Sequence, residues 1–411
     1  MTDSAIVIGA GITGVAAAEW LRRAGVSVTL VDRILPGRPD QASYGNAGLL
    51  ARCAVIPISE PGLIFKAPRM LLDRNSPLFL KWGYLPRLLP WLLPFLRNTA
   101  PSRHRPIVQA LAALTSDSVD QHLALSRGTP AESYIRQGDY AYYYRARRDF
   151  AHEAAETALR RAAGFDPIEL DSKALHARDP HLSDAYNFAA LYPDHGWLTS
   201  PGGYVAALAE HFMAQGGNFV QGEVADLSEG RITLLGGREI TAERIILTAG
   251  AWSGGLARKL GMTARLESER GYHLLLHQPS HMPTNPFMVA DAKFVVTPMQ
   301  DGLRCAGIVE FGGLDAPPSR APFDLLRKRI REVYPDLTWQ SESEWMGHRP
   351  STPDSLPHLG PIPGAPSIIA AFGGQHVGLT IGPKLGRIAA DLACDRQPNL
   401  PLDPYDPARF G

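Results

Sequence analysis

Three glycines near the start of the chain have the spacing of a phosphate-binding turn. Gly9, Gly11 and Gly14 follow the apolar run Ala5-Ile-Val-Ile and precede a helix-forming stretch, Val15 to Ala24. In this arrangement the first glycine makes a tight turn, the second lets the backbone approach a pyrophosphate, and the third lets the helix pack on the strand. The N-terminus of such a helix offers free N–H groups to phosphate oxygens.

An acidic residue completes this dinucleotide signature. Asp32 ends a second strand-like run that starts at Val26, and it lies 21 residues after Gly11. At this position a carboxylate accepts hydrogen bonds from the ribose hydroxyls of an adenosine. Because strand, helix, strand and terminal acid are in register, the sequence predicts a nucleotide site in a Rossmann-type domain.

A second glycine-rich loop lies near the other end of the chain. It runs from Phe372 to Pro383 and precedes a helix expected over Lys384–Cys394. Such a loop directs N–H groups at a negative centre, and a reduced flavin, negative at N1 and at the C2 carbonyl, fits that need. The alternative is an ordinary tight loop. The two loops together predict a nucleotide domain assembled from distant segments.

Composition narrows the class of protein. The 411 residues include 41 basic and 41 acidic side chains, so nothing indicates a nucleic-acid partner. Cys53, Cys305 and Cys394 lie far apart without a C-x-x-C pair, which argues against a disulfide framework and a metal site. An apolar strand begins within the first ten residues, so no signal peptide is expected and the cytoplasm is the expected compartment.

Residues 78–96 form an apolar stretch of membrane-spanning length. It is interrupted by two basic residues and three prolines, Lys81, Arg87, Pro86, Pro90 and Pro94. Hydrocarbon cannot satisfy the backbone groups that prolines free, so a span is not expected. Short helices packed on the core are the main expectation. The alternative is a peripheral surface that touches lipid through Trp82 and Trp91.

The coarse pattern of elements is that of an α/β protein. Apolar periodicity predicts helices over 108–127, 151–163 and 202–215. Strand-like runs lie at 139–144, 218–220, 245–248, 272–276, 294–297 and 304–309. We expect a nucleotide-binding domain built from 1–50, 150–260 and 345–411. A β-sheet-rich substrate domain is expected from 51–149 and 261–344.

Five motifs together resemble the FAD-dependent D-amino-acid dehydrogenases, within the D-amino-acid oxidase, glycine oxidase and sarcosine oxidase superfamily. They are Gly9-Ala-Gly-Ile-Thr-Gly with Asp32, Ser43-Tyr-Gly-Asn-Ala-Gly-Leu, Glu269-Arg-Gly-Tyr-His, Gly347-His-Arg-Pro-Ser-Thr-Pro-Asp and Gly373-Gly-Gln-His-Val-Gly-Leu-Thr. They occur in this order over essentially the whole chain. The resemblance implies a glutathione-reductase-like FAD domain and a β-sheet substrate domain that covers the flavin.

The same resemblance implies a substrate and an electron acceptor. Members of the family pass electrons to the respiratory chain at the membrane, so a quinone or another electron-transfer acceptor is expected, with peripheral contact through 78–96. The segments Glu269–His273 and Val309–Asp315 are similar to the branches acting on D-proline, cis-4-hydroxy-D-proline and D-alanine. A small or cyclic D-amino acid is therefore the expected substrate.

The chemistry calls for a group that binds a carboxylate. The Cα hydride of an amino acid passes to flavin N5, so the protein must orient the Cα–H bond. A guanidinium binds a carboxylate through two parallel hydrogen bonds. Arg349 matches the carboxylate-binding arginine of related oxidases, and a structural salt bridge is the alternative. The Tyr272 hydroxyl is the second candidate. His273, His348 and His376 suit structural roles, and only His376 is expected near the ring.

The resemblance also transfers cofactor contacts where the motifs match. Ser43, Asn46, Ala47, Gly48 and Leu49 are expected along the isoalloxazine edge, and Val224, Ala249 and Gly250 on the adenine side. The remaining expected contacts are Gly9, Gly11, Ile12, Thr13, Gly14, Asp32, Arg33, Trp252, Gly373, Gly374, Gln375, His376, Val377, Gly378, Leu379 and Thr380. Because no cysteine lies near Arg349 and no histidine lies in 43–49, the FAD is expected to be non-covalent.

Substrate identity and oxygen use stay open at this stage. Tyr140, Tyr142, Tyr143, Tyr144 and Trp345 could form an aromatic pocket, although tyrosines in paired strands are more often structural. An amine oxidase of the glycine or sarcosine type, which uses oxygen directly, is one alternative function. A non-catalytic FAD-binding subunit of an electron-relay complex is the other.

Overall fold

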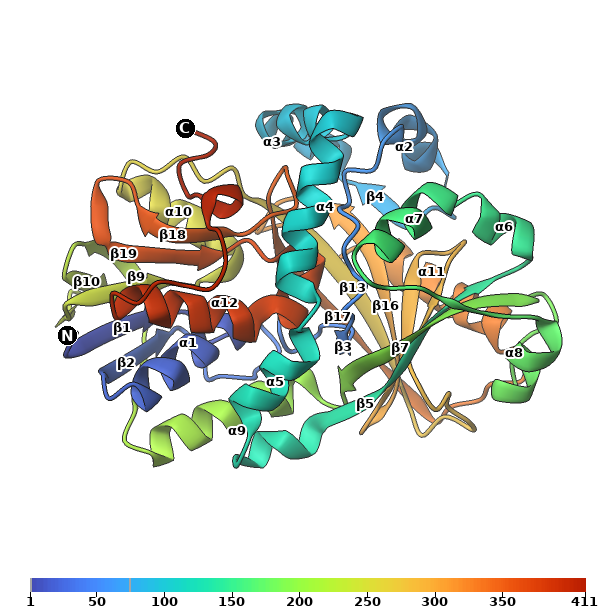
Figure 1. Ribbon diagram of the computed structural model, residues 1–411, viewed down its shortest axis with the longest axis horizontal. Helices are drawn as coiled ribbons and strands as arrows, with labels where there is room; N and C mark the ends of the chain where they lie inside the picture. Colours follow the sequence, from blue (N-terminus) through green and yellow to red (C-terminus); the bar gives the residue numbers. More distant parts are fainter. Residues whose placement is uncertain (1, 74) are drawn as a thin grey trace.

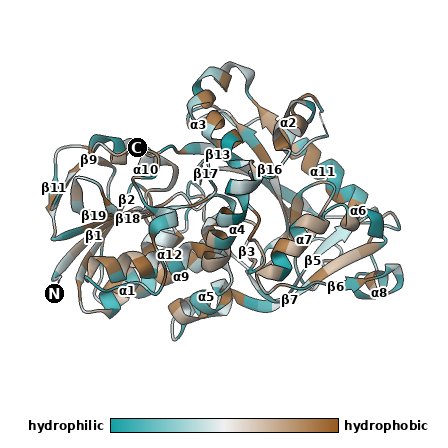
Figure 2. Ribbon diagram, turned by 45° about the horizontal axis from the view of Figure 1, so that its top comes forward, coloured by the Kyte–Doolittle hydropathy of each residue, from teal (hydrophilic) through white to brown (hydrophobic). Residues whose placement is uncertain are grey.

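The computed structural model describes residues 2–73 and 75–411, and two large sheets organise it (Figure 1). The first sheet has six strands that are parallel apart from β18, which runs antiparallel to β19. Its strands, in spatial order, are β18 (His358–Ile362), β19 (Ala365–Phe372), β12 (Arg244–Leu247), β1 (Ser4–Ile8), β2 (Ser27–Asp32) and β8 (Asn218–Gln221). The apolar colour of its central strands in Figure 2 reflects burial on both faces.

Alternate side chains of β1 pack on opposite faces of this sheet. Val7 packs with the helices α1 (Ile12–Arg23), α9 (Pro201–Ala214) and α12 (Gly378–Ala393). Ile6 and Ile8 pack on the opposite side, which is covered by a three-stranded sheet and by α10. Those covering elements are β9 (Val224–Ser228), β10 (Arg231–Leu234), β11 (Glu239–Thr241) and α10 (Ser253–Lys259). This is the expected Rossmann-type arrangement.

The second sheet is mixed and has ten strands. Its main path runs β17 (Ser341–Ser351), β13 (Glu267–His277), β16 (Gly302–Phe311), β15 (Phe294–Met299), β14 (Phe287–Val289), β5 (Ile135–Tyr144), β7 (Phe188–Leu198) and β3 (Leu49–Leu50). β4 (Leu78–Leu80) pairs with β16, and β6 (Ile168–Leu170) pairs with β7. The helix α11 (Ala321–Val333) packs on one face, through residues such as Phe323 and Leu326.

Strand pairing divides the chain somewhat differently from the sequence-based boundaries. β6 and β7 fall within 150–260, and β17 begins at Ser341 and runs past 345, yet all three belong to the substrate-side sheet. The expected helix over 108–127 is split into α4 (Pro101–Thr115) and α5 (Ser118–Ser126). The helix over 151–163 is likewise α6 (Arg147–Ala151) and α7 (Ala154–Ala162).

The proline-rich stretch 78–96 forms the short strand β4, a 3-10 turn and one 14-residue helix, in place of the expected short helices. After η1 (Trp82–Tyr84), α3 (Leu85–Asn98) runs through Pro90 and Pro94. Pro94 has no N–H for the carbonyl of Pro90, and Arg265 Nη1 donates to that carbonyl at 3.0 Å. A distant side chain therefore satisfies a backbone group that the proline leaves free.

The two tryptophans of this stretch have different environments. Trp91 is 5% exposed and stacks on Phe95, with 4.8 Å between ring centroids. Its expected contact with lipid is therefore wrong, whereas Trp82 is 58% exposed. Within residues 2–73 and 75–411, no helix combines the length and the apolar character that crossing a bilayer requires.

The last long helix starts earlier than expected. α12 begins at Gly378 and runs through Pro383, whereas the sequence predicted a start at Lys384. Pro383 cannot donate to the carbonyl of Leu379. His122 Nε2 lies 3.0 Å from that oxygen and donates to it, while its Nδ1 lies 3.1 Å from the Tyr204 hydroxyl.

Candidate active site

A cavity of about 1420 Å³ is lined by residues of both large sheets. Ordinary ligand pockets measure about 300–1000 Å³, so this one has room for a dinucleotide and a second molecule. The cofactor residues expected from the sequence that line it are Gly9, Gly11, Ile12, Thr13, Asp32, Arg33, Ser43, Asn46, Ala47, Leu49, Val224, Ala249, Gly250, Trp252 and all of 373–380. Gly14 and Gly48 do not line it.

The turn after β1 requires glycine at two positions. Gly9 has φ +101°, and a Cβ there would lie 2.6 Å from the carbonyl oxygen of Thr248. A Cβ on Gly14 would lie 1.7 Å from the carbonyl oxygen of Gly9. Gly14 therefore acts through helix–strand packing, which explains why it lies outside the cavity.

The N-terminus of α1 faces the cavity and is completed by a neighbouring loop. The helix has no side-chain cap of its own at Gly11, and Ile12 N donates to Ser43 Oγ at 3.1 Å. Asp32 Oδ2 accepts from Ala10 N at 2.7 Å, so the turn fixes the carboxylate beside the helix N-terminus. These groups suit a pyrophosphate and a ribose.

The loop 43–49 is held by side chains from the second sheet. Arg304 Nη1 donates to the carbonyl oxygens of Tyr44 and Asn46, at 3.2 and 2.6 Å. Burial lowers the pKa of Arg304 to about 10. His273 Nδ1 lies 2.8 Å from the carbonyl oxygen of Gly45. His273 was expected to be structural, and this contact agrees with that role. Arg304 was not predicted, because no local pattern marks it.

The second glycine-rich loop forms the wall next to the loop 43–49. Gln375 has φ +51°, and its Nε2 donates to the backbone oxygen of Thr352 at 2.9 Å, while its Oε1 has no hydrogen-bond partner among the described residues. Thr380 Oγ1 donates to the backbone oxygen of Leu49 at 3.0 Å, which ties this loop to the loop 43–49. The N-terminus of α12, at Gly378, lies at the cavity.

Arg349 lies across Gly271 and is paired on one side only. A Cβ on Gly271 would lie 2.5 Å from Arg349 Cζ, so only glycine lets the guanidinium rest on β13. Arg349 Nη1 donates to Glu269 Oε1 at 2.9 Å. Among the described residues, no acceptor contacts Nε or Nη2, and the side chain lines the cavity. The two free donors match the fork that a carboxylate accepts.

Glu269 was quoted in a motif but was not predicted to have a role. It is 2% exposed and is the cross-strand neighbour of Arg349 in the β13–β17 pair. Ser351 Oγ lies 3.4 Å from its other oxygen. The Glu269 carboxylate uses only Nη1 of Arg349. The guanidinium can therefore form this structural salt bridge and still offer its other nitrogens to a substrate carboxylate.

His376 lies close to this ion pair. It belongs to η4 (Gln375–Val377), and its buried Nδ1 has no hydrogen-bond partner in the described part of the chain. Burial lowers the pKa of His376; the nearby Glu269 carboxylate opposes this shift and Arg349 reinforces it. The imidazole is therefore neutral at neutral pH, so the positive charge at this ion pair belongs to Arg349.

Tyr272 faces away from Arg349, contrary to the sequence-based expectation. Its hydroxyl donates to Glu310 Oε2 at 2.7 Å and accepts from Ser319 N at 3.0 Å. Its ring packs against Phe323 of α11, and the residue is 1% exposed. Successive residues of a strand point to opposite faces, so Gly271 under Arg349 places Tyr272 in the core.

The expected aromatic pocket is only partly present. Tyr140, Tyr142 and Trp345 line the cavity, whereas Tyr143 stacks on a core phenylalanine and Tyr144 donates its hydroxyl to a glutamate. Near the nucleotide end, the Arg33 guanidinium lies 4.0 Å from the centre of the Trp252 ring. His348 has a structural role, because its Nδ1 lies 2.7 Å from Ser268 Oγ.

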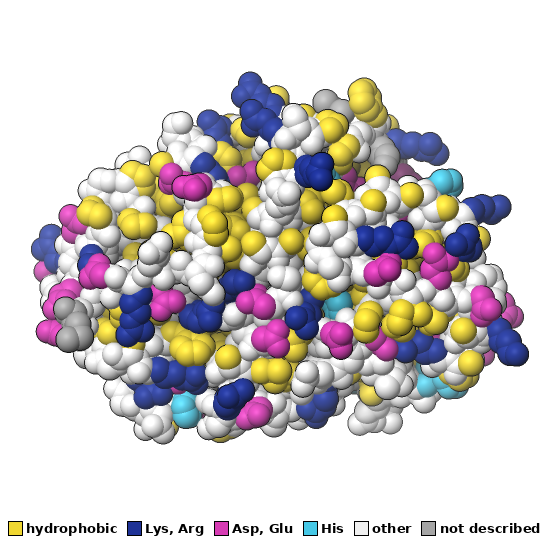
Figure 3. All heavy atoms as spheres, in the orientation of Figure 1, with side chains coloured by type: hydrophobic (Ala, Val, Ile, Leu, Met, Phe, Trp, Pro, Cys, Tyr) yellow, Lys and Arg dark blue, Asp and Glu magenta, His cyan; other side chains and the backbone are white. Residues whose placement is uncertain are grey.

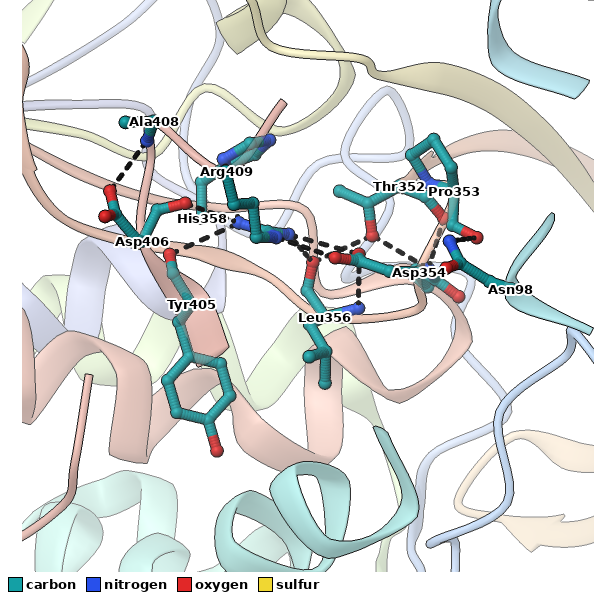
Figure 4. Close-up of polar contacts among 11 residues, drawn as sticks. Asn98, Thr352, Pro353, Asp354, Leu356, His358, Tyr405, Asp406, Ala408 and Arg409 are labelled. Carbon is teal, nitrogen blue, oxygen red and sulfur yellow. Dashed lines mark hydrogen bonds and ion pairs between the residues drawn. The ribbon is translucent and has the colours of Figure 1, made fainter. Parts of the chain in front are cut away.

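The end of the Arg349 strand is anchored by the C-terminus of the chain (Figure 4). Arg409 Nε and Nη2 donate to the two oxygens of Asp354 at 2.7 and 3.2 Å, and Nη2 also donates to the Leu356 carbonyl. From the opposite side, Asn98 Nδ2 donates to the Pro353 carbonyl at 3.1 Å. The acid that ends the G-x-R-P-x-T-x-D motif is thus a structural residue.

Comparison with known proteins gives the family of the chain. The family profile described as "FAD dependent oxidoreductase" matches residues 4–392. A D-amino-acid oxidase of Bradyrhizobium diazoefficiens is 36% identical over 98% of each chain. A D-amino acid dehydrogenase of Methylobacterium nodulans is 29% identical, also over 98% of each chain.

Solved structures agree on the fold. Glycine oxidase from Geobacillus kaustophilus superposes with a TM-score of 0.72 at 20% identity, covering 99% of this chain and 98% of that one. The glycine cradle, the free N-terminus of α1 and the size of the cavity all fit FAD. The chain therefore belongs to the FAD-dependent oxidoreductase family that this profile describes.

Proposed function

We propose that the protein oxidises a D-amino acid at Cα to an imine. Water hydrolyses the imine of a primary amine to a keto acid and ammonia, whereas a cyclic secondary amine gives a ring imine. The carrying observation is the Arg349 guanidinium, which lines the cavity with its Nη1 fixed by Glu269 and with no acceptor on Nε or Nη2 among the described residues. The relatives named D-amino-acid oxidase and D-amino acid dehydrogenase support the substrate class.

In the proposed reaction, the residues of the chain bind the substrate and orient it. Arg349 binds the substrate carboxylate, and Glu269 keeps the guanidinium flat on Gly271. His376, kept neutral by burial, does not compete for the carboxylate. FAD, when bound, supplies the two-electron oxidant. We further propose that it is held non-covalently by the contacts expected from the sequence, because Cys53 and Cys305 are buried with raised thiol pKa values.

Stereochemistry follows from fixing the carboxylate. With that group on Arg349, only one enantiomer can direct its Cα–H at the oxidant while its side chain enters the cavity. We propose the D-enantiomer, and small or cyclic substrates such as D-alanine, D-proline and cis-4-hydroxy-D-proline. We also propose that electrons leave to a quinone-type acceptor and that the protein contacts the inner face of the membrane through 78–96.

The test is anaerobic mixing of the purified yellow protein with D- and L-amino acids. Bleaching of the flavin band by D-amino acids alone is the expected result. Re-oxidation should then be fast with a quinone analogue and slow with oxygen. Bleaching by L-amino acids would overturn the stereochemical assignment, and rapid peroxide formation in air would favour the oxidase of the glycine or sarcosine type. FAD should be released on denaturation.

A further inference from the structure

Three successive carbonyl groups of the loop 43–49 are held by two side chains of the substrate-side sheet. Arg304 Nη1, on β16, donates to the carbonyl oxygens of Tyr44 and Asn46. His273 Nδ1, on the neighbouring strand β13, donates to the carbonyl oxygen of Gly45. These three carbonyls therefore point at the sheet.

The peptides of this loop consequently present their N–H groups to the other side. In a trans peptide the N–H points opposite to the C=O. Gly45, Asn46 and Ala47 line the cavity, whereas Arg304 and His273 do not. Within the described part of the chain, the N–H groups of Gly45 and Ala47 have no acceptor. Both belong to peptides whose carbonyl Arg304 holds, so Arg304 turns two free donors towards the cavity.

Trp345 fixes the loop in this orientation. A Cβ on Gly45 would lie 2.1 Å from Trp345 Cε3, so the indole ring packs directly on the loop. The ring also stacks on His273, with 5.1 Å between centroids, and its Nε1 donates to the Pro39 carbonyl at 2.6 Å. The loop is thus held by packing as well as by hydrogen bonds, and its donors are oriented before a ligand binds.

Arg304 is a buried cation that no carboxylate neutralises by contact. Over much of the face drawn in Figure 3, basic side chains lie beside acidic ones. The buried Arg270 of β13 likewise pairs with Glu310 at 2.7 Å. Arg304 is 6% exposed, donates only to the two carbonyls, and has no partner for Nε among the described residues. A ligand that becomes negative nearby would offset the cost of burying this charge.

We infer that Arg304 is a positioning residue that raises the reduction potential of the bound FAD. It directs the N–H groups of Gly45 and Ala47 towards the cavity, and its own charge lies behind them. A reduced flavin is negative at N1 and at the C2 carbonyl, so oriented donors and a nearby cation stabilise the reduced form more than the oxidised form. This inference rests on the proposed function, in which the loop 43–49 contacts the flavin ring.

Two substitutions of Arg304 separate its charge from its support of the loop. Arg304→Gln keeps an amide donor without the charge, whereas Arg304→Lys keeps the charge. The midpoint potential of the bound flavin is measured by slow reduction with xanthine and xanthine oxidase beside a reference dye, so no amino acid is needed. Arg304→Gln should lower the equilibrium constant for reduction about tenfold, which is about 30 mV for a two-electron couple. Arg304→Lys should stay close to the wild-type potential.

Arg136→Gln is the matched control, because Arg136 also donates to two backbone carbonyls but is exposed and lies outside the cavity. Its potential should equal that of wild-type protein, because solvent and salt screen an exposed charge. Equal potentials for wild type and Arg304→Gln would refute the inference, and so would equal losses in Arg304→Gln and Arg304→Lys.

A measurement on wild-type protein covers the case in which a variant fails to fold or to retain FAD. The wild-type potential should be more positive than that of free FAD, and a value at or below that of free FAD would contradict the inference. Flavin reduction by D-amino acids, measured separately, reports on the proposed function alone.

Discussion

At the scale of single residues, two neighbours fix the position of the Arg349 guanidinium. Gly271 gives the guanidinium room against the strand, and Glu269 occupies one of its nitrogens. The buried carboxylate offsets the cost of holding a cation beside an apolar cavity. Among the described residues, Nε and Nη2 remain without an acceptor, and the proposed function assigns them to the substrate carboxylate.

Arg349→Lys tests this geometry. Lysine keeps the charge but loses the two parallel donors, so we expect kcat/KM to fall. The loss should correspond to about 2–4 kcal/mol of transition-state stabilisation, the range for disrupting a desolvated charged pair. Steady-state kinetics with an excess of artificial dye measures it, and the FAD content per chain should not change. Arg238→Lys, at an exposed arginine outside the cavity, is the control. Unchanged kinetics for Arg349→Lys would mean that another cation holds the carboxylate.

Single residues also show which site contacts can be predicted from the sequence and which cannot. Gly14 and Asp32 could be assigned because their partners, Gly9 and Ala10, lie nearby in the sequence. Glu269 is the partner of Arg349 from 80 residues away, and only the β13–β17 register brings them together. The direction of the Tyr272 hydroxyl, towards Glu310, could not be predicted either, because a strand pattern shows alternation but does not say which face looks into the cavity.

At the scale of elements, the β1–α1 contact leaves no room for a side chain. In Gly14→Ala the new Cβ would meet the Gly9 carbonyl, and the helix would have to move away from the strand. We therefore expect loss of most bound FAD, measured by the ratio of flavin to protein absorbance. Gly83→Ala, with no atom within 4 Å of its added Cβ, is the matched control and should keep its FAD. Full FAD content in Gly14→Ala would contradict the packing role.

Two helices show why element boundaries were harder to predict than element types. α3 and α12 both contain internal prolines, which in isolation indicate a break. Arg265 supplies the missing donor in α3 and His122 in α12, from 175 and 257 residues away. Tertiary hydrogen bonds thus continue helices that local sequence would end.

Arg409→Gln tests the anchor at the end of β17. The Arg409 and Asp354 side chains are 13% and 12% exposed, so the substitution leaves a largely buried carboxylate without its cation. We expect the free energy of unfolding to fall by about 3 kcal/mol in urea titration. Arg161→Gln removes an exposed pair with Asp166 and should leave the free energy of unfolding nearly unchanged. Similar losses in both variants would refute the anchoring role.

At the scale of the whole molecule, buried histidines couple stability to pH. Burial lowers the pKa of His122 and of His195 from 6.5 to about 4. Between these values the unfolded chain binds protons that the folded chain does not, so the free energy of unfolding falls as the pH drops from 6.5 towards 4. Urea titrations across this range should show the decline.

A substitution of His195 measures its contribution to the loss of stability at low pH. His195→Gln should make the pH dependence of unfolding shallower, because one of the groups with a depressed pKa is gone. His152→Gln, at an exposed histidine, is the control and should keep the wild-type slope. A slope unaffected by His195→Gln would place the proton uptake elsewhere.

The route of the chain between the two large sheets limits how the molecule can open. It crosses from one sheet to the other four times, at β2–β3, β7–β8, β12–β13 and β17–β18. The hydrogen bond from Thr380 to Leu49 adds a further tie across the cavity. Hinge-bending of two rigid halves would strain all of these connections together. Ligand exchange is therefore expected to depend on local movement of elements that line the cavity, such as α3, more than on separation of the two sheets.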